Sequence, residues 1–171
     1  MSCSQKIIHK IEKILLDEFR QVPFHNLYYL GYSSEVEGSL GGTCSDKVMS
    51  FKSKLAVEGV NSALHTAFIK GKEIHRLLVI DIEGVNYFAD VGNGWPSIKL
   101  FPASNEITYT AFGITFKSRL RDGFLDVYQI KEADEYLSLA VPLQINDEHQ
   151  IWDDIENRFG GDVDYPFSNG L

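Results

Sequence analysis

The sequence predicts an α+β fold in which an N-terminal helical part packs on an antiparallel sheet that curls into a barrel or half-barrel. Two amphipathic patterns in the first 60 residues indicate helices. Further along, short runs rich in β-branched and aromatic residues follow one another, separated by glycine-containing turns. Consecutive strands with such short connections are typical of antiparallel sheets. A chain of 171 residues can bury a sizeable core as one domain, or as one domain with a small helical annex.

The first predicted helix covers residues 5–20, with Ser4 as its N-cap and an end before Pro23. Its apolar residues recur three and four positions apart on one stripe, which comprises Ile7, Ile8, Ile11, Ile14, Leu15 and Phe19. The next segment mixes proline, asparagine and aromatic residues without a clear period. We therefore expect an extended loop or a short helical turn there, followed by a glycine-rich connection up to Thr43.

The second predicted helix runs from Cys44 to about residue 56, and Gly59 is well suited to end it. Val48, Phe51 and Leu55 lie four, seven and eleven positions after the cysteine. This spacing puts all four side chains on one helical face. We therefore expect Cys44 to begin the helix on its buried side.

The predicted strands are the runs 63–70, 74–82, 85–91, 107–116, 124–130 and 135–141. The dipeptides Glu83-Gly84 and Asp122-Gly123 are expected hairpin turns. A last helix is expected after residue 146. The predicted organisation is a helical part over 1–60 that carries the cysteine, a sheet over 61–145, and a C-terminal helix and tail over 146–171.

Composition excludes several classes of function. A net charge of −8 with scattered basic residues argues against a nucleic-acid partner. No apolar run is long enough to span a membrane and no export signal is visible, so we expect a soluble, cytoplasmic protein. Cys3 and Cys44 form neither a disulfide framework nor a C-x-x-C site. The histidines outside the candidate site show no metal-ligand spacing, so no bound metal is expected.

Cys44 has the surroundings of a nucleophile. A helix N-terminus favours a thiolate, because its exposed N–H groups and its dipole stabilise negative charge. The glycines before Cys44 would let backbone N–H groups approach an oxyanion. A nearby imidazole could take the thiol proton, and a carboxylate could orient that imidazole. His75 and Asp90 are the candidates for these two roles.

The Glu83-Gly84 turn allows a test of whether His75 and Asp90 meet. With a two-residue loop, Leu77 lies opposite Asp90, and His75 points to the same side of the sheet as Leu77. His75 and Asp90 then share a face as diagonal neighbours, whereas a three-residue loop would separate them. The residues alone also allow a structural interpretation, in which a single buried cysteine is an inert hydrophobe and the histidine is an ordinary strand residue.

Four short motifs resemble those of the arylamine N-acetyltransferase family, and they occur in the family's order. The family's P-F-E-N, R-G-G-x-C-x-E, T-H-R-L and D-V-G-F-G correspond here to P-F-H-N at 23–26, L-G-G-T-C-S-D at 40–46, I-H-R-L-L-V at 74–79 and D-V-G-N-G at 90–94. The resemblance covers roughly residues 5–105. It implies a papain-like cysteine-triad fold.

The same resemblance implies that Cys44 takes an acyl group from acetyl-CoA or another acyl-CoA, with His75 as the base and Asp90 orienting it. A small amine would then accept the acyl group, and no cofactor would be tightly bound. The implied substrate and cofactor pocket consists of Phe24, Gly42, Thr43, Gly92, Asn93, Gly94 and Trp95.

Departures from the family pattern leave alternatives open. Leu40 and His25 replace an arginine and a glutamate, and Asn93 replaces a phenylalanine. Family members are also longer, and their last portion forms a lid over the cleft. We therefore expect a more open cleft with a different donor, a protein partner that completes the cleft, or a loss of transfer activity. The alternative functions are a thiol hydrolase or amide-exchange enzyme of the papain or transglutaminase type, and a catalytically inactive interaction module.

Overall fold

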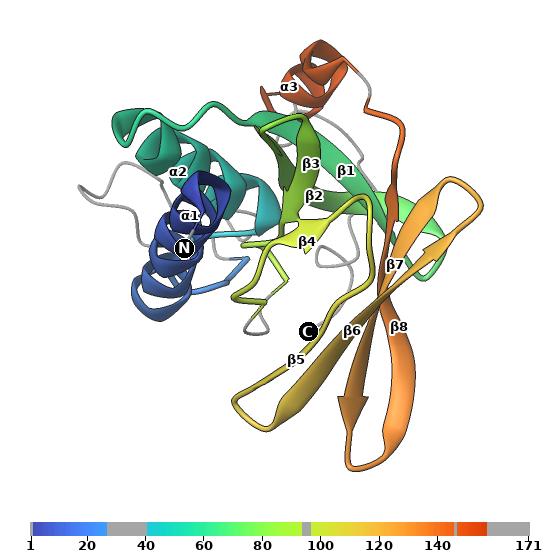
Figure 1. Ribbon diagram of the computed structural model, residues 1–171. Helices are drawn as coiled ribbons and strands as arrows, with labels where there is room; N and C mark the ends of the chain where they lie inside the picture. Colours follow the sequence, from blue (N-terminus) through green and yellow to red (C-terminus); the bar gives the residue numbers. More distant parts are fainter. Residues whose placement is uncertain (1, 27–40, 94–96, 146, 157–171) are drawn as a thin grey trace.

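The computed structural model describes residues 2–26, 41–93, 97–145 and 147–156 (Figure 1). The helices are α1 (Cys3–Gln21), α2 (Cys44–Val57) and α3 (Glu148–Glu156). The strands are β1 (Ala63–Ile69), β2 (Lys72–Ile82), β3 (Val85–Ala89), β4 (Phe101–Pro102), β5 (Thr108–Ala111), β6 (Ile114–Arg121), β7 (Phe124–Lys131) and β8 (Asp134–Pro142). The expected part boundaries at 60/61 and 145/146 fall between elements.

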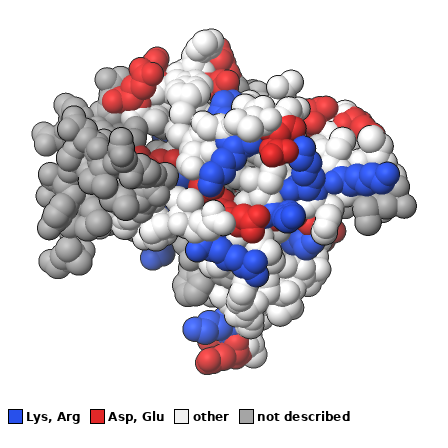
Figure 2. Space-filling view, turned by 90° about the vertical axis from the view of Figure 1, so that its left-hand side faces the viewer, with Lys and Arg blue, Asp and Glu red and all other residues white. Residues whose placement is uncertain are grey.

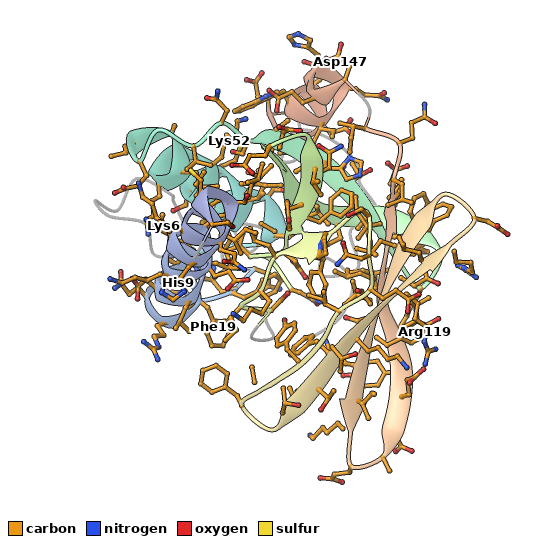
Figure 3. All side chains as sticks on the ribbon, in the orientation of Figure 1. Lys6, His9, Phe19, Lys52, Arg119 and Asp147 are labelled. Atoms are coloured by element: carbon orange, nitrogen blue, oxygen red, sulfur yellow. The ribbon has the colours of Figure 1, made fainter. Side chains whose placement is uncertain are left out.

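Helix α1 begins earlier than predicted. Its N-cap is Ser2, whose hydroxyl accepts from the Gln5 N–H at 3.2 Å while the Gln5 side chain accepts from the Ser2 N–H at 2.9 Å. The prediction of Ser4 as N-cap is therefore wrong, because the reciprocal pair of Ser2 and Gln5 caps the helix two residues earlier. Ser4 instead donates its hydroxyl to Glu83 at the β2–β3 turn. Figure 3 shows how side chains of α1 project around this helix, with Lys6 and His9 labelled.

Helix α2 begins and ends where its sequence indicates. Thr43 is the N-cap, and the Asp46 carboxylate accepts from both the N–H and the hydroxyl of Thr43, each at 2.9 Å. At the other end Gly59 has a φ of +73°, which glycine adopts at low cost. The predicted helix that starts at Cys44 is confirmed.

All eight strands form one antiparallel sheet in the order β4-β3-β2-β1-β8-β7-β6-β5. The order consists of two consecutive meanders, β1–β4 and β5–β8. They are joined where β1 pairs with β8, through Phe68 and Ala140. In Figure 1, α1 and α2 lie beside the β1–β4 half, and the β5–β8 half extends away from them. The predicted α+β class, with helices packed on a curled antiparallel sheet, is confirmed.

Strand β2 is buried on both faces and separates two hydrophobic clusters. Leu78 and Ile80 belong to the cluster between the sheet and the helices, which includes Leu15 of α1. Leu77 and Val79 point the other way, into the cluster shared with β6–β8. This alternation follows from the two-residue period of a strand. Residues at the ends of β2 and β3 therefore lie near the boundary of the two clusters.

The prediction of a single strand over 107–116 is wrong, because a hairpin interrupts it. Phe112 and Gly113, with φ values of 51° and 80°, form the turn between β5 and β6. A phenylalanine rarely occupies such a position, so the sequence carried only the glycine as a turn signal. The Phe112 ring packs on Phe19 of α1, with ring centroids 5.9 Å apart. Phe19 is labelled in Figure 3. The turn at Asp122-Gly123 and the last helix are confirmed.

Charges of both signs are intermingled on the face shown in Figure 2, where lysines and arginines alternate with acidic side chains. Ion pairs between side chains include Lys10 with Glu58 at 2.8 Å and Lys99 with Glu12 at 2.6 Å. Of the helices that the structure describes, none is long and apolar enough to cross a membrane.

Candidate active site

Cys44, His75 and Asp90 come together where the N-terminus of α2 meets the ends of β2 and β3. Each is only 3% exposed. His75 donates Nε2–H to Asp90 Oδ1 at 2.8 Å. The strand register explains this contact, because Ile82 pairs with Val85 across a two-residue turn and His75 and Asp90 therefore share a face. The predicted two-residue turn is confirmed. We refer to these three residues as the Cys44 group.

A β-bulge lies directly before His75. Ala67 of β1 pairs with His75, but Phe68 pairs with Glu73, so Ile74 has no partner across the ladder. The carbonyl of Ile74 instead accepts from the Cys44 thiol, with the sulfur 3.9 Å away. His75 also makes a side-chain hydrogen bond with Cys44. Because Asp90 occupies Nε2, the other ring nitrogen, Nδ1, is the one left for the sulfur.

Opposing effects act on the imidazole of His75. Burial by itself lowers its pKa, because a charged ring loses its hydration. The charge and hydrogen bond of Asp90, together with the interactions with Cys44, outweigh burial and raise the pKa of His75 from 6.5 to about 10. At neutral pH the ring is therefore held as an imidazolium, the form that stabilises a neighbouring thiolate.

Because Gly92 has no side chain, it leaves room for Cys44 and His75. A Cβ at this position would lie 2.6 Å from the Cys44 Cβ, 2.8 Å from the Cys44 Cα and 3.3 Å from the His75 Cε1. The Gly92 N–H also donates to Asp90 Oδ1 at 3.2 Å. Asp90 Oδ1 thus accepts two hydrogen bonds, one from the imidazole and one from the backbone two residues on.

A pocket of about 460 Å³ opens above Cys44 and His75, which is within the range of small-molecule sites. Its lining includes Phe24, Gly92 and Asn93, three of the residues named from the sequence as a substrate and cofactor pocket. Gly42 and Thr43 are not among its lining residues. They lie under the start of α2, where Gly42 forms a bridge with Phe24. Gly94 and Trp95, also predicted for the pocket, lie outside the described residues.

Sequence reasoning missed the wall that the β1–β2 hairpin contributes, which consists of Ile69, Lys70, Lys72 and Ile74. Its run Lys70-Gly71-Lys72 lies between the predicted strands 63–70 and 74–82, a position that indicates only a turn. The sequence did carry one signal for this wall. Ile74 and Lys72 lie one and three positions before His75, so they must be close to it at the same end of the strand.

Asn93 connects the pocket to the other half of the sheet. Its amide donates to the Ser138 hydroxyl of β8 at 3.0 Å, and Gln129 donates to the same oxygen at 2.9 Å. Tyr136 donates in turn to Gln129 at 2.5 Å. This chain of side chains fixes Asn93 as a polar group on a mostly apolar pocket wall. In the described part of the chain, no group of three or more His, Cys, Asp and Glu side chains could hold a metal ion.

No protein-family model and no curated protein matches this sequence. Solved structures do match. An arylamine N-acetyltransferase from Nocardia farcinica superposes with a TM-score of 0.78 at 15% identity, over 94% of this chain and 65% of that one. Arylamine N-acetyltransferase C from Bacillus anthracis gives 0.74 at 18% identity, over 95% and 73%. An enzyme of the same kind from Bacillus cereus, with a Cys-His-Glu triad, gives 0.72 at 16% identity, over 95% and 72%.

The expected resemblance to arylamine N-acetyltransferases is thus confirmed, and at these identities it concerns the fold. The chain covers 65% of the length of the Nocardia protein and somewhat more of the two Bacillus proteins.

Proposed function

We propose that the protein is an acyltransferase that carries an acyl group on Cys44, taken from an acyl-CoA and passed to a small amine. The observation that carries the proposal is the Cys44 group itself, a buried thiol, imidazole and carboxylate in hydrogen-bond contact at the floor of a pocket. The likeness of the fold to arylamine N-acetyltransferases supports the same chemistry.

In the first half-reaction, the Cys44 thiolate attacks the thioester carbonyl and forms a new C–S bond. The bond to the coenzyme sulfur breaks, and the imidazolium of His75 gives its proton to the departing thiolate. In the second half-reaction, the amine attacks the Cys44 thioester and loses a proton to the now neutral imidazole. Cys44 leaves as thiolate, and both halves together restore the starting state.

Charge at the mouth of the pocket supports an anionic donor. Lys70 in the β1–β2 turn and Lys72 at the start of β2 are exposed, and none of the described lining residues carries a carboxylate. The whole chain has a net charge of −8, so this local excess of positive charge differs from the rest of the molecule. A CoA thioester would place its phosphates at this positive mouth and its reacting carbonyl at Cys44 on the floor.

The test is incubation with acetyl-CoA followed by mass spectrometry of the intact protein and its peptides. We expect the mass of one acetyl group on the peptide that contains Cys44, and its removal when an arylamine such as 4-aminosalicylate or a hydrazine is added. Cys44→Ser should abolish the transfer. Cys3→Ser, which removes the exposed cysteine in α1, is the matched control and should leave the transfer unchanged.

Other outcomes point to the alternatives. Reaction with peptide amides or simple esters but not with acetyl-CoA would replace the proposal with a thiol hydrolase or amide-exchange enzyme. Alkylation of Cys44 by iodoacetamide at the rate of an ordinary thiol, together with no acylation, would indicate an interaction module instead.

A further inference from the structure

One wall of the pocket carries a polar side chain that the proposed reaction does not use. Asn93 is half-buried and lines the pocket together with Cys44 and His75. The other side chains of the described lining are apolar, apart from the two lysines at the mouth. Ligand sites commonly combine a largely apolar lining with a few placed polar groups, and these groups decide which ligand is accepted. Asn93 has the position for that role.

Hydrogen bonds to the other half of the sheet orient the Asn93 amide. Its Nδ2–H donates to the Ser138 hydroxyl at 3.0 Å, and the fully buried Gln129 donates to the same oxygen at 2.9 Å. Because Tyr136 donates to the carbonyl oxygen of Gln129, Gln129 turns its amino group to Ser138. The amino group of Asn93 is thus engaged, and none of the described residues donates to its Oδ1. The acceptor end of the amide is left for a ligand in the pocket.

Asn93 lies beside the place where an acyl group would be held. The preceding residue, Gly92, approaches Cys44 so closely that a Cβ on it would lie 2.6 Å from the Cys44 Cβ. An acyl group on the Cys44 sulfur therefore begins next to the wall that Gly92 and Asn93 form, whereas the acceptor amine has to arrive from the mouth. Lys70 and Lys72 disfavour a second cation in this space, so a neutral hydroxyl suits Asn93 better than an ammonium.

We propose that Asn93 selects the acyl group, and that the acyl donor is the CoA thioester of a short hydroxy acid whose hydroxyl donates to Asn93 Oδ1. The inference rests on the acyl transfer proposed above and names the class of acyl group that Cys44 takes. An apolar acyl group would displace water from Asn93 Oδ1 and leave it unpaired, which costs binding and rate. Acetyl-CoA reacts through the same bond changes but lacks the hydroxyl.

An asparagine with only a structural role makes a different prediction. Such a residue would join the loop after β3 to β8 through Ser138. Its loss would lower the stability of the protein and slow acylation by all donors alike. The ratio of the rates for two matched donors separates the two roles, because the amount of folded protein cancels in that ratio.

The experiment measures the rate constant for acylation of Cys44 in the full chain, by mass spectrometry of protein quenched at successive times. Glycolyl-CoA and propionyl-CoA form a matched pair, because a hydroxyl in the first replaces a methyl group in the second. The pair 3-hydroxypropionyl-CoA and butyryl-CoA repeats the comparison with a longer chain. A hydroxyl also makes the thioester carbonyl more electrophilic, so each ratio in wild type is divided by the same ratio in Asn93→Leu.

We expect this quotient to favour the hydroxyacyl donor by about tenfold in at least one of the two pairs, the scale of one hydrogen bond between neutral groups. Ser138→Ala removes the anchor of the Asn93 amide but keeps its oxygen, so its ratio should lie between those of wild type and Asn93→Leu. Asn86→Leu is the matched control and should keep the wild-type ratio. Asn86 is also half-buried on β3, but it pairs with Asp81 near the β2–β3 turn and is not among the described lining residues.

A quotient near one in both pairs, in folded Asn93→Leu protein, would overturn the inference, and so would an equal change of ratio in Asn86→Leu. Two further donors test the unmodified protein, whatever the variants do. Methoxyacetyl-CoA can accept a hydrogen bond but cannot donate one, so acylation as fast as that by glycolyl-CoA would contradict the role of Asn93 Oδ1. Faster acylation by succinyl-CoA than by glycolyl-CoA would also overturn it, because the lysines would then choose the acyl group. If no CoA thioester acylates Cys44, the proposed function itself fails, which distinguishes the two failures.

Discussion

The floor and the mouth of the pocket are held in place in different ways. At the floor, Cys44, His75 and Asp90 are almost fully buried and joined by hydrogen bonds that follow from a helix start and a strand register. At the mouth, Lys70 lies in the β1–β2 turn and Lys72 begins β2, and both are exposed. The difference is that the fold fixes the geometry of the floor, whereas a few exposed side chains set the charge at the mouth.

The largest expected effect is at the floor, from Asp90→Asn. An amide cannot stabilise the imidazolium of His75 and can hold the ring in the wrong tautomer. We expect the rate of acyl transfer from acetyl-CoA to fall by about 10³- to 10⁴-fold. Asp126→Asn is the matched control, because Asp126 is equally buried and pairs with Arg121 on β6, away from the pocket. A similar loss of rate in both variants would show that general destabilisation is the cause.

Gly92→Ala tests how tightly the floor is packed. The new Cβ would lie 2.6 Å from the Cys44 Cβ and 2.8 Å from its Cα, so the start of α2 or the loop that carries Gly92 must move. We expect a loss of about 100-fold in the rate of Cys44 acylation, the scale of a small misplacement of reacting groups. Gly113→Ala, at a turn with open space and a φ of +80°, should cost only about 1 kcal/mol of stability. Full activity in Gly92→Ala would contradict the packed floor.

At the mouth, we expect a smaller effect on binding alone. Changing Lys70 and Lys72 together to glutamate should raise KM for acetyl-CoA by about tenfold with kcat nearly unchanged, because the charge acts equally on substrate and transition state. Added salt should reduce the difference between variant and wild type, since screening weakens exposed charges. Lys131→Glu, on the β7–β8 turn, is the control. An unchanged KM would remove the lysines from donor recognition.

The smallest expected effect is on stability as a function of pH. The pKa of His75 is raised from 6.5 to about 10 in the folded protein, so the folded state binds the proton more tightly than the unfolded state. The stabilisation is complete below pH 6.5 and is lost as pH rises toward 10. The difference in melting temperature between wild type and His75→Gln should therefore narrow over that interval. A constant difference would show that His75 is not protonated in the fold.

Features set by backbone periodicity could be predicted from the sequence. The start of α2 at Cys44 followed from the apolar spacing, and the shared face of His75 and Asp90 followed from a two-residue turn. The hairpin at Phe112 could not be predicted. The positive φ of Phe112 is unfavourable, and it is offset by packing of the ring on Phe19, which is distant in sequence. Packing also explains why the burial of Lys47 could not be predicted. A lysine in an amphipathic helix is normally solvated, and only the structure shows that α1 covers it.

The contribution of the β1–β2 hairpin to the pocket could not be predicted for another reason. The bulge at Ile74 shifts the ladder by one residue, which turns the end of β2 and directs its carbonyl to Cys44. Nothing in the run of apolar residues around Ile74 indicates a bulge, so the neighbouring lysines could be assigned only to a turn.

The pairing of Phe68 with Ala140 joins the β1–β4 meander to the β5–β8 meander within the one sheet. Every residue of the Cys44 group belongs to the β1–β4 side of that seam, whereas Ser138, which anchors Asn93, belongs to the other side. We expect native-state hydrogen exchange to release the amides of β5–β8 as one unit, before those of β2 and β3. Asn93 on the pocket wall would then lose its hydrogen bond to Ser138, while the thiol and its base stay in register.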